Sequence, residues 1–116
     1  HPRVNVPATD TAPLTTILQK HPQVKVQLLN AFRTIRGLSI ASLAKLGVSF
    51  EIAMLEGVNG VANLLEKLPA EQLCFGSHFP FFYFESAKLK LQESDLTPAQ
   101  LNALHSRSAR HLLGHA

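Results

Sequence analysis

The chain has 116 residues, 46% apolar and 16% charged, which indicates one folded unit and excludes a disordered chain. Its net charge of +3 comes from scattered Lys and Arg, and it lacks both the basic run that would track a nucleic-acid backbone and the roughly 20 apolar residues that a membrane span needs. The single Cys74 cannot form an internal disulfide, so a reducing cytoplasm is the expected location.

The first part of the chain alternates strand and helix signals. Residues 4–6 form a short strand candidate, and residues 10–20 have the cap and apolar spacing of a helix, with Asp10 as its predicted N-cap. The pair His21-Pro22 ends this helix, because the residue before proline is pushed out of the helical region. The β-rich residues 24–29 predict a second strand.

The remaining elements continue the alternation. Helical spacing over residues 39–46 stops at Gly47, and the apolar period of two over residues 48–54 predicts a strand. In the last helix, Thr97 and Gln100 form a predicted capping box. The other predicted elements are helices over residues 57–68, 84–92 and 97–112 and a strand over residues 73–77.

This order, βαβαβαβα with one extra C-terminal helix, predicts an α/β fold with a parallel sheet and right-handed crossovers. No composition break divides the chain, so residues 1–116 are treated as a single unit. A closed (β/α)8 barrel needs on the order of 250 residues, so this length supplies only about half of one. We expect such an open half to be poorly soluble or to self-associate as a homo-oligomer.

Two segments carry a family resemblance. LCFGSHFPFFYFESAKLKL, residues 73–91, and LTPAQLNALHSRSARHLLG, residues 96–114, resemble the end of amidohydrolase-related barrel enzymes. In those enzymes an apolar strand finishes in Phe-Gly-Ser-Asp-x-Pro, and a helix ending in Leu-Leu/Phe-Gly closes the chain. The resemblance implies that this chain is the C-terminal half of a TIM barrel, strands five to eight.

The same resemblance implies a divalent metal, zinc first, held by histidines and a strand-eight Asp that also takes a proton from the metal-bound water. His78 stands where that Asp is expected, and Asn30 where the family often has a strand-six His. His1 is a further candidate ligand, and its correspondence to the strand-five His is left open because that assignment depends on the residues before it. Imidazole can ligate a metal or accept a proton, whereas an Asn amide is a poor zinc ligand.

Polar residues that follow strands are the first candidates for a site, because parallel α/β folds gather reactive groups at the carboxyl ends of their strands. His78 is the predicted catalytic residue and a metal ligand. The predicted substrate-binding residues are Asn30, Glu56, Ser77 and Phe79.

Structural roles compete with these assignments. His78 could hydrogen-bond a neighbouring loop, Asn30 could be a turn former, and Glu56 could be a carboxylate at a helix N-terminus. Glu51 could point into the barrel, where it would need a partner. The aromatic residues over 79–84 suit either a substrate wall or core packing, and packing is favoured.

The leading functional hypothesis is metal-dependent hydrolysis of C–N or C–O bonds, or decarboxylation, of a small organic substrate by the parent barrel, with this part inactive alone. The alternative is a metal-free degenerate barrel that serves as a binding or structural module. A complete flavodoxin-like domain is disfavoured, because no Gly-rich phosphate loop follows any strand.

Overall fold

A computed structural model describes residues 7–35 and 37–115. The predicted strand over residues 4–6 and the candidate ligand His1 therefore lie outside the described residues.

Three short parallel strands form the centre of the molecule. They are β1 (Gln27–Leu28), β2 (Ser49–Glu51) and β3 (Leu73–Cys74), in the order β1-β2-β3. In register, Gln27 lies opposite Ser49 and Phe50 lies opposite Leu73. Strands that follow one another in the chain are thus neighbours in the sheet, joined by crossovers that contain helices. The predicted α/β class with a parallel sheet is confirmed at this level.

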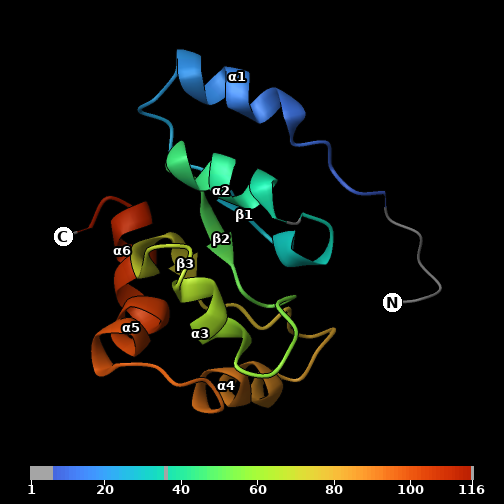
Figure 1. Ribbon diagram of the computed structural model, residues 1–116, viewed down its shortest axis with the longest axis vertical. Coiled ribbons are helices and arrows are strands. Elements are labelled where there is room, and N and C mark those ends of the chain that lie inside the picture. Colours follow the sequence, from blue (N-terminus) through green and yellow to red (C-terminus); the bar gives the residue numbers. More distant parts are fainter. Residues whose placement is uncertain (1–6, 36, 116) are drawn as a thin grey trace.

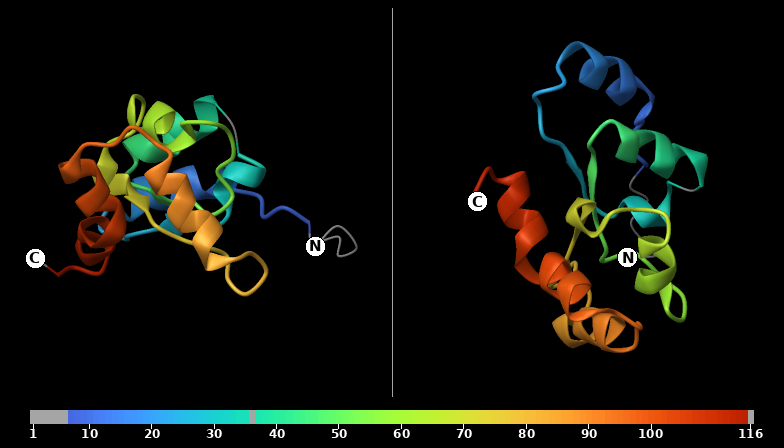
Figure 2. Two further views of the ribbon diagram at one scale, coloured as in Figure 1. Left: turned by 90° about the horizontal axis from the view of Figure 1, so that it is seen from below. Right: turned by 60° about the vertical axis from the view of Figure 1, so that its left-hand side comes forward.

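Helices surround the sheet. Helix α1 lies at one end of the molecule and α4 at the other, while α5 and α6 continue one another along one side (Figures 1 and 2). Within the described residues, no helix is both long and apolar enough to cross a membrane. The helices are α1 (Ala12–Lys20), α2 (Leu38–Lys45), α3 (Gly60–Leu65), α4 (Phe84–Gln92), α5 (Pro98–Asn102) and α6 (Ser108–Leu112), with 3-10 turns η1 (Ala31–Arg33) and η2 (Ala70–Gln72) and a π-helical segment η3 (Ala103–Arg107).

The predicted capping box at the start of α5 is present. Thr97 Oγ1 accepts a hydrogen bond from the Gln100 amide at 3.2 Å, and Gln100 Oε1 accepts one from the Thr97 amide at 2.9 Å. The helix then widens into η3, where the carbonyl of Leu104 accepts a hydrogen bond from the Phe75 amide at 3.1 Å. This bond joins the C-terminal helix to the chain directly after β3.

Several elements are shorter than predicted because side chains and turns end them early. The strand predicted over residues 48–54 ends at Glu51, since the Leu55 amide closes a turn on the Ile52 carbonyl at 3.0 Å. The helix predicted over residues 57–68 begins at Gly60, after Asn59 in the left-handed region at φ 55°. Asp10 is not the N-cap of α1, which is Thr11, although Asp10 Oδ1 accepts from the Ala12 amide at 2.9 Å.

The core lies around β2. Val48, Phe50 and Ile52 have no exposed surface, and the rings of Phe32 and Phe50 lie 5.8 Å apart. The alternate residues Ser49 and Glu51 are also buried, at 6% and 7% exposure. Both sets of β2 side chains are therefore out of water, so this strand can place a carboxylate in the interior of the molecule.

Candidate functional site

The Glu51 carboxylate is the centre of a hydrogen-bonded group at the carboxyl ends of the strands. Oε2 accepts from the Asn30 amide at 3.1 Å, directly after β1, and Oε1 accepts from the Ala53 amide, directly after β2. A buried carboxylate is costly unless hydrogen bonds satisfy it, and these two amide donors do so. Glu51 therefore holds the ends of two strands together. The two amides are the partners that Glu51 was expected to need, because it alternates with apolar residues.

Gly76 brings the third strand end to the same carboxylate. A Cβ added at Gly76, two residues after β3, would overlap the carboxylate oxygen and the Cγ and Cδ atoms of Glu51. Glycine is required here by close approach, because a side chain would have to displace a buried group. All three strand ends thus meet at Glu51.

Lys90 of α4 adds a cation to this group. Its Nζ donates hydrogen bonds of 2.9 Å to the carbonyls of Ile52 and Ala53, at the end of β2. Burial lowers the pKa of Lys90 below its ordinary value, while the carboxylates of Glu51 and Glu56 act in the opposite direction. We define Glu51, Gly76 and Lys90, with the amides of Asn30 and Ala53, as the Glu51 hub.

Asn30 has the backbone conformation of a turn residue and an unpartnered side-chain oxygen. Its φ of 55° lies in the left-handed region that Asn tolerates, and it precedes η1. Its Oδ1 is buried without a hydrogen-bond partner among the described residues. A buried acceptor of this kind is uncommon, so the side chain has capacity for a donor that these residues do not supply.

His78 stands just past β3, also in the left-handed region, at φ 55°. Its imidazole lies against two aromatic rings that follow it, with centroids 5.3 Å from Phe81 and 5.4 Å from Phe82. The His78 carbonyl accepts from the amides of the same two residues at 3.0 and 3.3 Å. His78 and the two Phe residues therefore form one compact turn at the edge of the sheet.

The segment from 79 to 84 presents its aromatic side chains to solvent. Phe84 packs edge-on against Phe75 at 5.6 Å between centroids, yet it is still 44% exposed. The core-packing role favoured for this cluster is thus wrong for most of it. The exposed members are Phe79, Phe81, Phe82, Tyr83 and Phe84.

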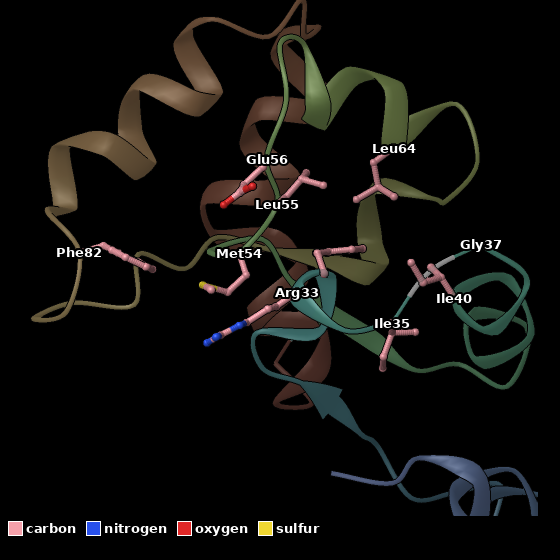
Figure 3. Close-up of a pocket in the computed structure, with 10 residues that line it drawn as sticks. Arg33, Ile35, Gly37, Ile40, Met54, Leu55, Glu56, Leu64 and Phe82 are labelled. Carbon is pink, nitrogen blue, oxygen red and sulfur yellow. The ribbon is translucent and has the colours of Figure 1, made fainter. Parts of the chain in front are cut away.

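A cavity of about 490 Å³ opens beside this edge of the sheet. Ile35, Ile40 and Leu64 lie toward one side of it, while Arg33 and Glu56 direct their charged ends toward the segment that carries Phe82 (Figure 3). The cavity is therefore apolar on one side and charged on the other. Its lining residues are Phe32, Arg33, Ile35, Gly37, Ile40, Met54, Leu55, Glu56, Leu64 and Phe82.

The structure places the predicted substrate-binding residues at different points of this region. Glu56 lines the cavity, and it is not a helix N-terminal carboxylate, since no acidic residue stands in the first turn of α3. His78 reaches the cavity only through Phe82, which touches its ring. Ser77 accepts from the amide of the exposed Phe79 at 3.3 Å, so both belong to the turn beside the cavity and not to its lining.

The donors for a metal centre are incomplete within the described residues. Among residues 7–35 and 37–115, no three side chains of His, Cys, Asp or Glu are grouped as a metal would require. Both Glu51 oxygens accept backbone amides, and the His78 ring lies against two Phe rings. A catalytic zinc site uses three protein ligands, so the described residues do not fit such a site on their own.

The sequence gives no signal for the functional-site roles of Arg33, Lys90 and Gly76. Arg33 and Lys90 sit in a 3-10 turn and a helix, away from strand ends, where no pattern marks them. Gly76 belongs to the Phe-Gly-Ser segment of the resemblance, but its structural role is its close approach to Glu51. Glu51 alone had a signal, a carboxylate in an otherwise apolar alternation.

Comparisons with known proteins place no family name on this arrangement. No protein-family model, curated protein or solved structure matches the chain.

Proposed function

We propose that the chain is the C-terminal half of a (β/α)8-barrel hydrolase of the amidohydrolase-related kind, acting on C–N or C–O bonds of a small organic substrate. The observation that carries this proposal is the cavity beside the carboxyl ends of three parallel strands, with Glu56 in its wall and His78 next to it. Ligand sites of α/β folds occupy that edge, and about 490 Å³ suits a small molecule.

His78 is the residue to which we assign proton transfer. A neutral imidazole is matched to accepting a proton near neutral pH. In hydrolysis the water oxygen bonds to the carbonyl carbon as the imidazole takes the water proton, and the leaving nitrogen or oxygen then receives that proton. The described residues do not complete a metal site, so zinc would need donors from elsewhere and no step is placed on it.

The alternative is a binding module without catalysis. The incomplete donor set among the described residues favours it specifically. In a binding module the cavity and the Glu51 hub would still position a ligand. The turn that carries His78 would have no chemical role. The two functions thus differ in what His78 contributes.

Hydrolysis of a panel of aryl esters and anilides by the purified parent barrel that contains this chain, with and without added zinc, separates them. The hydrolase proposal predicts turnover that His78→Ala reduces by about a hundredfold or more, with His105→Ala, an exposed histidine on η3, as the matched control. Turnover that is equal in both variants removes His78 from the mechanism. Absence of turnover in the wild-type protein contradicts the hydrolase proposal and leaves the binding module.

A further inference from the structure

Neither charge of the cavity is in a salt bridge in the described part of the chain, although the Glu56 carboxylate lies close enough to Lys90 to act on its pKa. Within residues 7–35 and 37–115 the one salt bridge joins Arg107 to Glu71, neither of which lines the cavity. Neither Arg33 nor Glu56 donates or accepts a side-chain hydrogen bond there. Both side chains are exposed, so their charged ends are available to a ligand.

The arrangement of these charges constrains the ligand. In Figure 3 the guanidinium of Arg33 and the carboxylate of Glu56 point to the same side of the cavity, with the Met54 thioether between them. A plain anion would meet Arg33 but would be repelled by Glu56, and a plain cation would have the opposite conflict. A ligand head group that carries both a negative and a positive charge would be attracted by Arg33 and by Glu56.

The opposite side of the cavity is apolar. Ile40 and Leu64 are half-buried and pack against the hydrophobic core, and Ile35 does the same. An aliphatic body placed there would lose water-exposed surface without stranding a polar group. The ligand is therefore charged at one end and apolar at the other.

We infer that this cavity binds a free α-amino acid with an apolar side chain, its carboxylate on Arg33 and its ammonium on Glu56. This inference rests on the proposed small-molecule site and names the class of ligand that the site takes. Arg offers a bidentate fork to a carboxylate, and Glu accepts the hydrogen bonds of an ammonium. The neighbouring Lys90 is engaged by two backbone carbonyls, so it does not take the place of the ligand ammonium.

Three matched probes test the inference by isothermal titration calorimetry on the whole chain. L-leucine carries both charges, isocaproate lacks the ammonium, and isoamylamine lacks the carboxylate. We expect L-leucine to bind up to about fivefold more tightly than either analogue, a preference set by exposed ion pairs. Equal or weaker binding of L-leucine overturns the inference.

Charge-removing variants assign the two ends. Arg33→Gln should remove the preference for L-leucine over isoamylamine, and Glu56→Gln should remove its preference over isocaproate. Arg110→Gln on α6 and Glu66→Gln after α3 are controls with exposed charges that do not line the cavity, and should leave both preferences intact. A preference that survives in Arg33→Gln and Glu56→Gln contradicts the assignment.

The outcome is independent of hydrolysis. Charge-dependent L-leucine binding by a protein without turnover supports the inference while the hydrolase proposal fails. Ester or anilide turnover without any preference for L-leucine supports the hydrolase and overturns the inference.

Discussion

The end of β2 and the turn after β3 lie at the same edge of the sheet but are held in different ways. Glu51 is 7% exposed and bonded to the amides after β1 and β2, with Gly76 packed against it. The turn that carries His78 is closed by its own local contacts, and its Phe81 is 74% exposed. A buried polar framework that fixes the strand ends therefore lies beside an exposed aromatic rim, which consists of Phe79, Phe81, Phe82, Tyr83 and Phe84.

Gly76→Ala gives the largest expected effect, because it forces the framework open. The new Cβ would overlap the Glu51 carboxylate, so we expect a loss of about 3 kcal/mol in the free energy of unfolding, measured by urea denaturation. Gly60→Ala is the matched control, since its nearest neighbour would lie at 3.6 Å, in ordinary contact. Equal stability of the two variants would contradict the close approach of Gly76 and Glu51.

Glu51→Gln tests the acceptor role of the carboxylate. One amide donor, after β1 or β2, would face the Gln NH2 group in place of an oxygen. Leaving a buried donor unsatisfied costs about 2 kcal/mol, again read from urea denaturation. The exposed Glu66→Gln should change stability by less than about 0.5 kcal/mol. A neutral effect of Glu51→Gln would show that the two amides find other acceptors.

The Cys74 thiol should give a smaller effect, which appears in the pH dependence of stability. Burial raises the pKa of its thiol above the ordinary 9.0, and the Glu51 carboxylate adds to that shift. The folded protein then keeps a proton that the unfolded chain releases, so stability is lost as pH rises above 9.0. We expect the difference in melting temperature between the wild-type protein and Cys74→Ala to move in favour of the variant above that pH. A constant difference would contradict a raised thiol pKa.

Phe81→Ser probes the open rim and has the smallest expected effect on stability. Its side chain is 74% exposed, so the free energy of unfolding should change by less than about 0.5 kcal/mol. Removing one ring from an exposed aromatic cluster should instead reduce self-association, measured by analytical ultracentrifugation at increasing protein concentration. Phe50→Ser makes the same change at a fully buried position and should unfold the protein. The two substitutions contrast the exposed rim with the core.

The fold class could be predicted because it depends on local patterns. The capping box at Thr97 and the stop at Gly47, now seen at φ 82°, are decided by neighbouring residues alone. Strand lengths could not be predicted, because the turn that ends β2, closed by the Leu55 amide on the Ile52 carbonyl, also includes the buried Glu51, which accepts the amide of Ala53. The half-barrel architecture stays a prediction.

The candidate site divides in the same way. Asn30, Glu56 and His78 could be found because they follow predicted strands. Arg33 and Lys90 could not, since a 3-10 turn and a helix bring them to this edge only after the chain has folded. Gly76 is a further case, because close approach to a residue 25 positions earlier leaves no local signal.

Amide hydrogen exchange measures whether Glu51 fixes the strand ends on which the candidate site lies. We expect slow exchange at the amides of Asn30 and Ala53, fast exchange at the exposed Tyr83 and Phe84, and acceleration of the first pair alone in Glu51→Gln. Exchange at Asn30 and Ala53 as fast as in the aromatic rim, or unchanged by Glu51→Gln, would contradict this role of Glu51.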